Sequence, residues 1–250
     1  MKISIITCSY NSANTIRRAI KSVQNQNYKN IEHIIMDGSS QDKTIEIIKK
    51  FKKKNLFFFS SKDNGFYYAL NKATTLSNGE IVGILHSDDF FHNNKILSDI
   101  AKIFKNTNAD IVYGDLMYVK KNFPFKPVRF WKSEDFEIKK IFSGWMPPHP
   151  TVFIKKKILN KIGIYNTKYR IAADYDFLIR AFKLKNIKIV YIPKIITNMR
   201  VGGMSNASIK NLIIKSSEDF RIIKKNKIGG IGVLLNKNFS KLKQFFYIKN

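Results

Sequence analysis

The sequence is poor in cysteine, in acidic residues and in long apolar runs. Its one cysteine, Cys8, lies in an apolar segment and excludes an internal disulfide, which fits a core thiol in a reducing compartment. No run of about 18 apolar residues occurs, so no segment is predicted to span a bilayer. The apolar start is too short for a signal peptide and predicts a first strand. We therefore expect a cytoplasmic protein.

Acidic residues number 18 against 45 lysines and arginines, a formal net charge of +27. Two explanations of this excess remain open. One is a lysine-rich solvated surface that reflects genome composition, and the other is attraction to an anionic membrane or a phosphate-rich ligand. A nucleic-acid-binding protein is a further alternative, because 13% of the residues are aromatic. However, no RNP1 or zinc-finger motif occurs and lysine far exceeds arginine, so no specific nucleic-acid partner is expected.

The first half of the chain alternates strands with amphipathic helices. Strands are predicted at residues 2–8, 31–37, 56–60 and 80–85. Helices are predicted between them, one built on Ile16, Ala19, Ile20 and Val23, and two over residues 41–54 and 66–77. The alternation predicts a parallel sheet with right-handed crossovers, whose ligands bind beyond the carboxyl ends of the strands.

Four of the scarce carboxylates follow these strands. Asp37 closes the second strand, Asp63 follows the third, and the adjacent pair Asp88 and Asp89 follows the fourth. Neighbouring carboxylates repel each other, and a divalent cation carried in with substrate phosphates, Mg²⁺ or Mn²⁺, relieves that repulsion. The sequence contains neither GxGxxG after the first strand nor GxxxxGK[ST], so the dinucleotide and P-loop interpretations fail on their own motifs.

Five ordered segments resemble family 2 inverting glycosyltransferases of the GT-A fold. They are SYN (9–11), MDGSSQDKT (36–44), SSKDNGFYYALNKA (60–73), GEIVGILHSDD (79–89) and AADYDFLIRA (172–181). The pattern is most similar to bacterial enzymes that build capsule, exopolysaccharide or lipopolysaccharide. The resemblance spans about residues 2–205 and implies an α/β domain with a mixed, mainly parallel sheet flanked by helices. We expect this domain at residues 1–219, with a nucleotide-sugar half (1–90) and an acceptor half (91–219).

The resemblance also implies roles for individual residues. It implies that Tyr10 stacks on the nucleobase, with Asn11 beside it in the donor site. Asp37 and Asp63 would accept hydrogen bonds from the base and ribose. Asp88 would contact the ribose or the metal, and Asp89 would coordinate Mn²⁺ or Mg²⁺, which neutralises the departing nucleoside diphosphate.

The chain departs from the family pattern in three respects. Relatives commonly have Asp where Tyr68 stands and Gly where Ala73 stands, so neither position is assigned to the site. GT-A enzymes often use a late histidine as a metal ligand, and no histidine follows His149. Either His149 or water and diphosphate would complete the metal shell. His86, before the carboxylate pair, is interpreted as a strand-end residue.

The segment ADYDFLIRAFK (173–183) offers two candidates for the base that an inverting transfer needs. On a helix, Asp174 shares a face with Phe177, Leu178 and Ala181. Asp176 lies on the opposite side, where it can form an ion pair with Arg180. The family pattern also points to Asp174. We therefore predict that Asp174 is the base and that Asp176 is structural.

Three further segments complete the sequence-based prediction. His149, in PPHPTVFIK, would line the cleft near the donor phosphate or the acceptor, or be a loop histidine held by its prolines. NMRVGGMS (198–205) resembles a closing loop, in which Arg200 pairs with diphosphate or is a surface arginine. Residues 220–250 carry eight basic and no acidic side chains. This basic extension is predicted to bind a membrane interface, with a frayed tail or a packed helix as alternatives.

Taken together, these features predict a metal-dependent hexosyl- or N-acetylhexosaminyltransferase. Its donor would be a nucleotide sugar, most often a UDP-sugar in this family. Its acceptor would be a glycan or a polyprenyl-diphosphate-linked glycan, reached at the inner face of the cell membrane. A sugar-phosphate nucleotidyltransferase is the other enzymatic alternative. However, the segment SYNSANT (9–15) lacks the glycine-rich loop that is typical of such enzymes.

Overall fold

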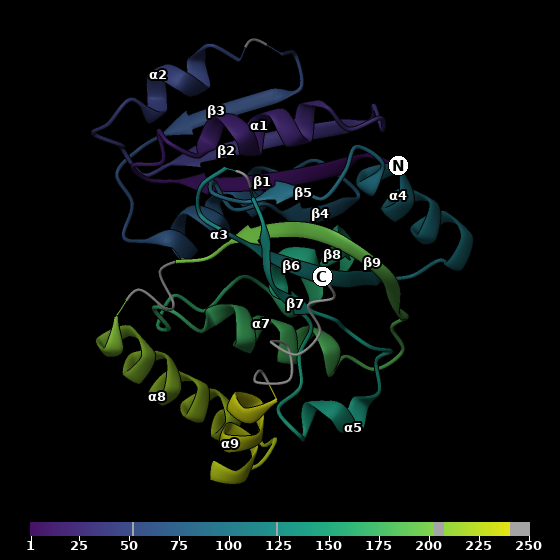
Figure 1. The fold of residues 1–250 in the computed structure, drawn as a ribbon. Coiled ribbons are helices and arrows are strands. Elements are labelled where there is room, and N and C mark those ends of the chain that lie inside the picture. Colours follow the sequence, from purple (N-terminus) through teal and green to yellow (C-terminus); the bar gives the residue numbers. More distant parts are fainter. Residues whose placement is uncertain (52, 124, 203–207, 241–250) are drawn as a thin grey trace.

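The computed structural model describes residues 1–51, 53–123, 125–202 and 208–240 (Figure 1). In these residues nine strands form one sheet in the order β3-β2-β1-β4-β8-β6-β9-β5, with β7 paired to β6. The strands are β1 (Ile3–Ser9), β2 (Ile31–Asp37), β3 (Leu56–Ser60), β4 (Ile81–Ile84), β5 (Phe90–Phe91), β6 (Ile111–Val119), β7 (Pro127–Trp131), β8 (Phe153–Lys155) and β9 (Ile189–Arg200).

Helices connect these strands and cover both faces of the sheet. They are α1 (Ile16–Gln24), α2 (Thr44–Lys49), α3 (Phe66–Leu76), α4 (Ile96–Thr107), α5 (Ile138–Ile141), α6 (Lys156–Ile162), α7 (Ala173–Phe182), α8 (Ile209–Lys225) and α9 (Ile231–Phe239). A short 3₁₀ helix, η1, lies at His149–Thr151. No helix within the described ranges has the length and apolar character needed to cross a membrane.

The sheet is mixed and mainly parallel, as predicted. β3, β2, β1 and β4 pair in parallel, and β6 pairs in parallel with β9. β8 lies antiparallel between β4 and β6, while β5 and β7 are antiparallel to β9 and β6. Six strands therefore point the same way, and their carboxyl ends share one edge.

The four strands predicted in the first half are present, but the predicted helix over 41–54 is wrong in extent. α2 covers only Thr44–Lys49. The Asp42 carboxylate accepts hydrogen bonds from the backbone N–H and the hydroxyl of Thr44, which holds the chain in a turn before the helix. At the other end, the N–H groups of Lys50 and Phe51 bond to carbonyls three residues back, a tightened last turn.

The two faces of β1 belong to two different apolar cores. Ile3 and Ile5 pack in the cluster that contains α4, whereas Ile6 and Cys8 pack in the cluster that contains α3 and α7. This alternation follows from the two-residue period of a strand. Cys8 is buried, and burial raises the pKa of its thiol, as expected for an inert core cysteine.

The chain beyond residue 219 differs from the expected separate extension. α8 crosses the predicted boundary at 219/220, and Ile222, Ile223 and Leu234 are buried in the same cluster as α3 and α7. Up to residue 240 the tail therefore packs as helices on the domain, one of the two alternatives named for it, and membrane binding by this segment stays a prediction. Residues 241–250, also part of that prediction, lie outside the described residues.

Candidate active site

The carboxyl edge of the sheet gathers the polar residues that the sequence singled out. β1, β2, β3 and β4 end at this edge, as do β6 and β9 (Figure 1). Asp37 is the last residue of β2, and Asp63 and the pair Asp88 and Asp89 follow β3 and β4. The predicted convergence of four carboxylates on one edge is therefore observed.

The first part of the site is the close approach of Tyr10 and Asp63 to Gly38. A Cβ built on Gly38 would lie 3.0 Å from Asp63 Oδ2 and 3.4 Å from Cδ2 of the Tyr10 ring. Tyr10 is exposed, and Asp63 is held by a 2.8 Å hydrogen bond from the Gly65 N–H to its Oδ1. An exposed ring next to an oriented carboxylate suits a planar base with N–H donors.

Asn11 shapes the loop that carries Tyr10. It adopts a left-handed backbone conformation with φ of 46°, which asparagine tolerates better than most residues. Its N–H donates to Ser40 Oγ at 2.9 Å, and its Oδ1 accepts from the Gln41 N–H at 2.9 Å. Asn11 thus joins the loop after β1 to the loop after β2.

Asp37 does not have the exposure that its predicted role requires. It is fully buried, and its Oδ1 accepts hydrogen bonds from the hydroxyls of Ser9 and Ser40. Its Oδ2 accepts from the Ser40 N–H and the Ser60 hydroxyl. With both oxygens occupied, Asp37 positions the ends of β1, β2 and β3 around Tyr10 and Asp63. The expected direct contact with base or ribose is not supported by this geometry.

Asp88 and Asp89 occupy different environments. Asp88 is half-buried, whereas Asp89 is 1% exposed and its Oδ1 accepts a 3.1 Å hydrogen bond from the Arg200 N–H. Burial raises the pKa of Asp89 well above its usual value, and the Asp88 charge raises it further. Asp89 therefore joins β4 to the end of β9, and Asp88 is the member that solvent and a ligand can reach. That Asp89 coordinates the metal stays a prediction.

The carboxylate pair fits a cation that arrives with its substrate better than a resident metal. Within the described ranges, no group of three or more His, Cys, Asp or Glu side chains could hold an ion. Asp89 Oδ2 is buried without a hydrogen-bond partner, next to the more accessible Asp88. Mg²⁺ commonly binds through one or two carboxylates together with substrate phosphates, and this donor set matches that pattern.

Arg200 is buried at the end of β9, which excludes the surface alternative. It is 8% exposed, and its Nε is buried with no hydrogen-bond partner. Its guanidinium lies 4.9 Å from the centre of the Phe125 ring, and that of Arg18 lies 4.2 Å from the same ring. Burial and the Arg18 charge lower the pKa of Arg200, while Asp88 and Asp89 raise it. Arg200 thus lies close to the carboxylate pair, and Arg18, which the sequence did not indicate, lies near Arg200 on the same ring.

Asp174 lies in the first turn of α7 and is half-buried. Its Oδ1 accepts a 2.8 Å hydrogen bond from the Tyr175 N–H and lies 3.5 Å from the Tyr67 hydroxyl. Tyr67, on α3, donates to the Ile171 carbonyl at 2.8 Å, so it fixes the chain just before the helix. The carboxylate is oriented and remains accessible, as a general base must be.

Two histidines lie between Asp174 and the strand ends. Burial lowers the pKa of His86, while the charges of Asp88 and Asp174 both raise it. Burial lowers the pKa of His149 to about 4, and Asp174 opposes this. His149 is buried and its Nε2 lies 2.9 Å from the Tyr165 hydroxyl, so it supports the wall of the site instead of lining an open cleft.

Asp176 forms the predicted ion pair with Arg180, with a distance of 2.8 Å from Nε to Oδ2. It is nevertheless fully buried, because α8 covers that side of α7. Asn226, just after α8, donates to Asp176 Oδ1 at 3.4 Å. The predicted pairing is confirmed, and the burial of Asp176 fits its predicted structural role. Of the predicted closing loop, residues 198–202 are described and residues 203–205 lie outside the described residues.

Comparison with known proteins identifies the class. The family model for glycosyl transferase family 2 matches residues 4–171, and the chain belongs to this family. A PGL/p-HBAD biosynthesis glycosyltransferase of Mycobacterium bovis (strain BCG / Pasteur 1173P2) is 27% identical over 217 residues, which is 85% of this chain and 82% of the relative. The chain is thus a glycosyltransferase, which excludes the nucleic-acid-binding and nucleotidyltransferase alternatives.

Solved structures show the same fold. S. aureus TarS 1–349 in complex with UDP superposes with a TM-score of 0.71 and 23% identity, covering 100% of this chain and 76% of that one. Mannosyltransferase PcManGT from Pyrobaculum calidifontis, in complex with GDP-Man and Mn²⁺, gives 0.64 and 15%, with the same coverage of each chain. The predicted GT-A fold is confirmed.

Proposed function

We propose that this protein is an inverting glycosyltransferase that transfers one sugar from a UDP-sugar to a glycan or lipid-linked acceptor in the synthesis of a surface polysaccharide. The observation that carries this proposal is the position of Asp174. Asp174 Oδ1 lies 3.5 Å from the Tyr67 hydroxyl, and the ring of the neighbouring Phe66 lies 5.3 Å from that of His86, two residues before Asp88. This proximity supports a single site for the donor-side and acceptor-side carboxylates. That UDP and UDP-GlcNAc are bound by TarS supports a uridine donor.

Each part of the site has a role in this reaction. The exposed ring of Tyr10 stacks on the base, and Asp63 accepts a hydrogen bond from the base or ribose. Asn11 and Asp37 hold the loops that carry them. Asp174 takes the proton from the acceptor hydroxyl as its oxygen attacks the anomeric carbon from the face opposite the diphosphate. The bond from the anomeric carbon to the diphosphate oxygen breaks, with inversion of configuration.

Negative charge that develops on the leaving diphosphate requires compensation. A divalent cation bound there would supply Lewis-acid neutralisation, and Mn²⁺ in the PcManGT complex supports a metal of this kind. Asp88 would hold it, and Asp89 would keep the end of β9 in place through the Arg200 backbone. Arg200, buried beside this pair, offers a second positive charge to the diphosphate.

The test is a screen of donor hydrolysis over UDP-, GDP- and dTDP-sugars, each with Mn²⁺, Mg²⁺ or EDTA. We expect turnover of a UDP-sugar that requires the cation. Asp174→Asn should bind UDP as the parent does and reduce turnover about 10²-fold or more, the scale of general-base catalysis. Unchanged turnover in Asp174→Asn would remove it as the base, and hydrolysis of GDP- or dTDP-sugars alone would contradict the uridine donor.

A further inference from the structure

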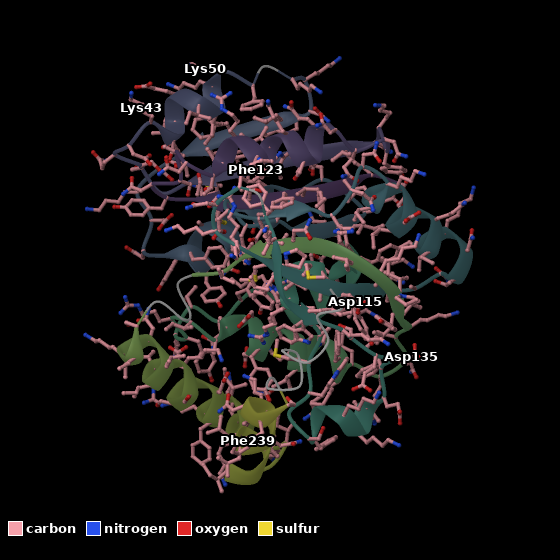
Figure 2. The ribbon with its side chains drawn as sticks, in the orientation of Figure 1. Lys43, Lys50, Asp115, Phe123, Asp135 and Phe239 are labelled. Atoms are coloured by element: carbon pink, nitrogen blue, oxygen red, sulfur yellow. The ribbon has the colours of Figure 1, made fainter. Side chains whose placement is uncertain are left out.

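The end of the molecule formed by α8 and α9 exposes an unusual amount of apolar surface. Ile209, Leu212 and Ile213 of α8 are 78%, 46% and 65% exposed. Ile231, Leu235 and Phe239 of α9 are 61%, 49% and 63% exposed. Phe239 lies at the α8–α9 end of the molecule, opposite the α2 end that carries Lys43 and Lys50 (Figure 2). We call these six side chains the α8–α9 face.

The apolar residues follow the helical period and border a groove. Ile209, Leu212 and Ile213 recur at i, i+3 and i+4, and Ile231, Leu235 and Phe239 recur at i, i+4 and i+8, so each helix presents one stripe. A groove of about 470 Å³ runs beside the α8 stripe, lined by Ile209, Leu212, Ile213, Ser216, Ser217, Phe220 and Leu234. Leu234 belongs to α9, so the groove connects the two helices.

The exposed charges on α8, α9 and their connection all have one sign. Between residues 208 and 240 the sequence has two acidic residues, Glu218 and Asp219, and both are buried. Asp219 is neutralised by Lys237, with 2.5 Å between Oδ1 and Nζ. The exposed charged side chains of the two helices and their connection are cationic: Lys210, Arg221, Lys224, Lys225 and Lys227.

We propose that the α8–α9 face docks on an anionic lipid bilayer. The two helices and their connection combine exposed aliphatic and aromatic side chains with lysine and arginine and expose no carboxylate of their own, which matches the composition of an interfacial membrane-binding surface. A second copy of the chain is a poor occupant, because it would bring a like-charged face from a protein of the same net charge of +27. The apolar side chains enter the headgroup region, and the cations bind lipid phosphates.

The same two helices hold the segment that carries Asp174. Glu218 of α8 accepts backbone hydrogen bonds from Arg170 (2.7 Å), Ile171 (2.9 Å) and Ala172 (2.8 Å). Lys237 of α9 lies 3.6 Å from the centre of the Tyr175 ring. These contacts join α8 and α9, and so the proposed membrane-binding face, to residues within four positions of Asp174. That this contact brings a lipid-linked acceptor to Asp174 rests on the proposed function, whereas the membrane contact does not.

The experiment is co-sedimentation of the full chain with vesicles of phosphatidylcholine, with and without phosphatidylglycerol. We expect binding that requires phosphatidylglycerol and is only partly reversed by salt. Ile213→Asp and Phe239→Asp should each lower the partition coefficient about tenfold or more, because each replaces apolar burial with a charge that anionic lipid repels. Ile164→Asp is the matched control, since Ile164 is 57% exposed and belongs to neither α8 nor α9. It should bind as the parent does.

Several outcomes would overturn the proposal. They are equal binding of the parent to neutral vesicles, parent-like binding of both face variants, or an equal loss in Ile164→Asp. A parent dimer in light scattering that Ile213→Asp dissociates would assign the face to a second copy. Circular dichroism melting verifies that each variant is folded. UDP-sugar hydrolysis by Ile213→Asp without vesicles should stay within about twofold of the parent, so a failure of docking and a failure of the transferase assignment are separate results.

Discussion

At the scale of single residues, two adjacent aspartates have unequal access to solvent. Asp88 and Asp89 are neighbours in the sequence. The fold buries Asp89 beneath the end of β9 and leaves Asp88 half-buried. We therefore propose that Asp88 is the carboxylate that a cation reaches from solvent and that Asp89 supports the end of β9.

Asp88→Asn should weaken UDP binding in Mn²⁺ and leave binding in EDTA nearly unchanged, because only the metal-dependent contact is lost. Asp89→Asn retains an oxygen for the Arg200 N–H and should keep most of the metal dependence. Titration calorimetry of UDP with each variant, with and without Mn²⁺, measures both effects. The reverse result, with Asp89→Asn losing the metal dependence and Asp88→Asn retaining it, would restore Asp89 as the ligand.

Asp176 provides a matched test of stability. It is fully buried, pairs with Arg180 and accepts from Asn226. Breaking a buried ion pair leaves the partner charge uncompensated, so Asp176→Asn should lower the free energy of unfolding by about 3 kcal/mol. Urea denaturation measures this change. Asp174→Asn, two residues earlier and half-buried, should lower it by less than about 1 kcal/mol, and an equal loss in both variants would contradict this account.

At the scale of elements, α8 is a support of the site as well as a surface helix. One buried carboxylate, Glu218, holds three consecutive N–H groups of the turn that leads into α7. Such a turn has no repetitive backbone partners of its own, so its conformation depends on that side chain. The position of Asp174 is therefore linked to a residue 44 positions later in the chain.

Glu218→Gln should lower kcat about tenfold or more while leaving KM for the UDP-sugar nearly unchanged. The amide replaces one acceptor oxygen by a donor, so one backbone N–H loses its partner and the turn before Asp174 shifts. Small displacements of a catalytic group cost this much. Steady-state hydrolysis kinetics measure kcat and KM separately, and Glu46→Gln on the exposed side of α2 is the control. A rise in KM with kcat unchanged would place Glu218 outside the support of the base.

At the scale of the whole molecule, the described part of the tail belongs to the domain. Removing everything after Asp219 would take Ile222, Ile223 and Leu234 out of the apolar core, exposing the side chains that they cover, and would leave the buried Asp219 without Lys237. Both losses are costly, since unpaired buried charge and exposed core each destabilise a protein. A truncation therefore tests stability and membrane binding together, and surface substitutions on α8 and α9 separate them.

Stability should fall as the solution is acidified from about pH 6 to about pH 4. Burial lowers the pKa of His33 to about 3 and that of His149 to about 4, below the value of about 6.5 in an unfolded chain. The unfolded state then binds more protons in this range, so unfolding is favoured as pH falls. His33 alone should contribute about 2 kcal/mol of this loss. His33→Gln should retain that stability at pH 4 relative to pH 6, as measured by urea denaturation, and an unchanged pH dependence would contradict the assignment.

Local sequence patterns determined several elements of the fold, the edge of the sheet that forms the site, and one ion pair. The alternation of buried strands and amphipathic helices predicted β1 to β4 and α1 to α3, because side-chain periodicity reports which face is buried. Carboxylates at strand ends predicted the edge of the sheet that carries Asp63 and Asp88, since parallel strands end at the same edge. The spacing within α7 predicted the Asp176–Arg180 pair, because residues four apart on a helix are neighbours.

Tertiary structure alone decided which polar groups remain accessible. Asp37 and Asp89 resemble ligands in sequence, but packing surrounds Asp37 with four hydrogen-bond donors and covers Asp89 with β9. Likewise, only the fold pairs Lys237 with Asp219, which places α9 in the core instead of a loose basic tail. Burial depends on contacts between distant segments, such as Glu218 with the turn at 170–172, and a local pattern carries no information about those contacts.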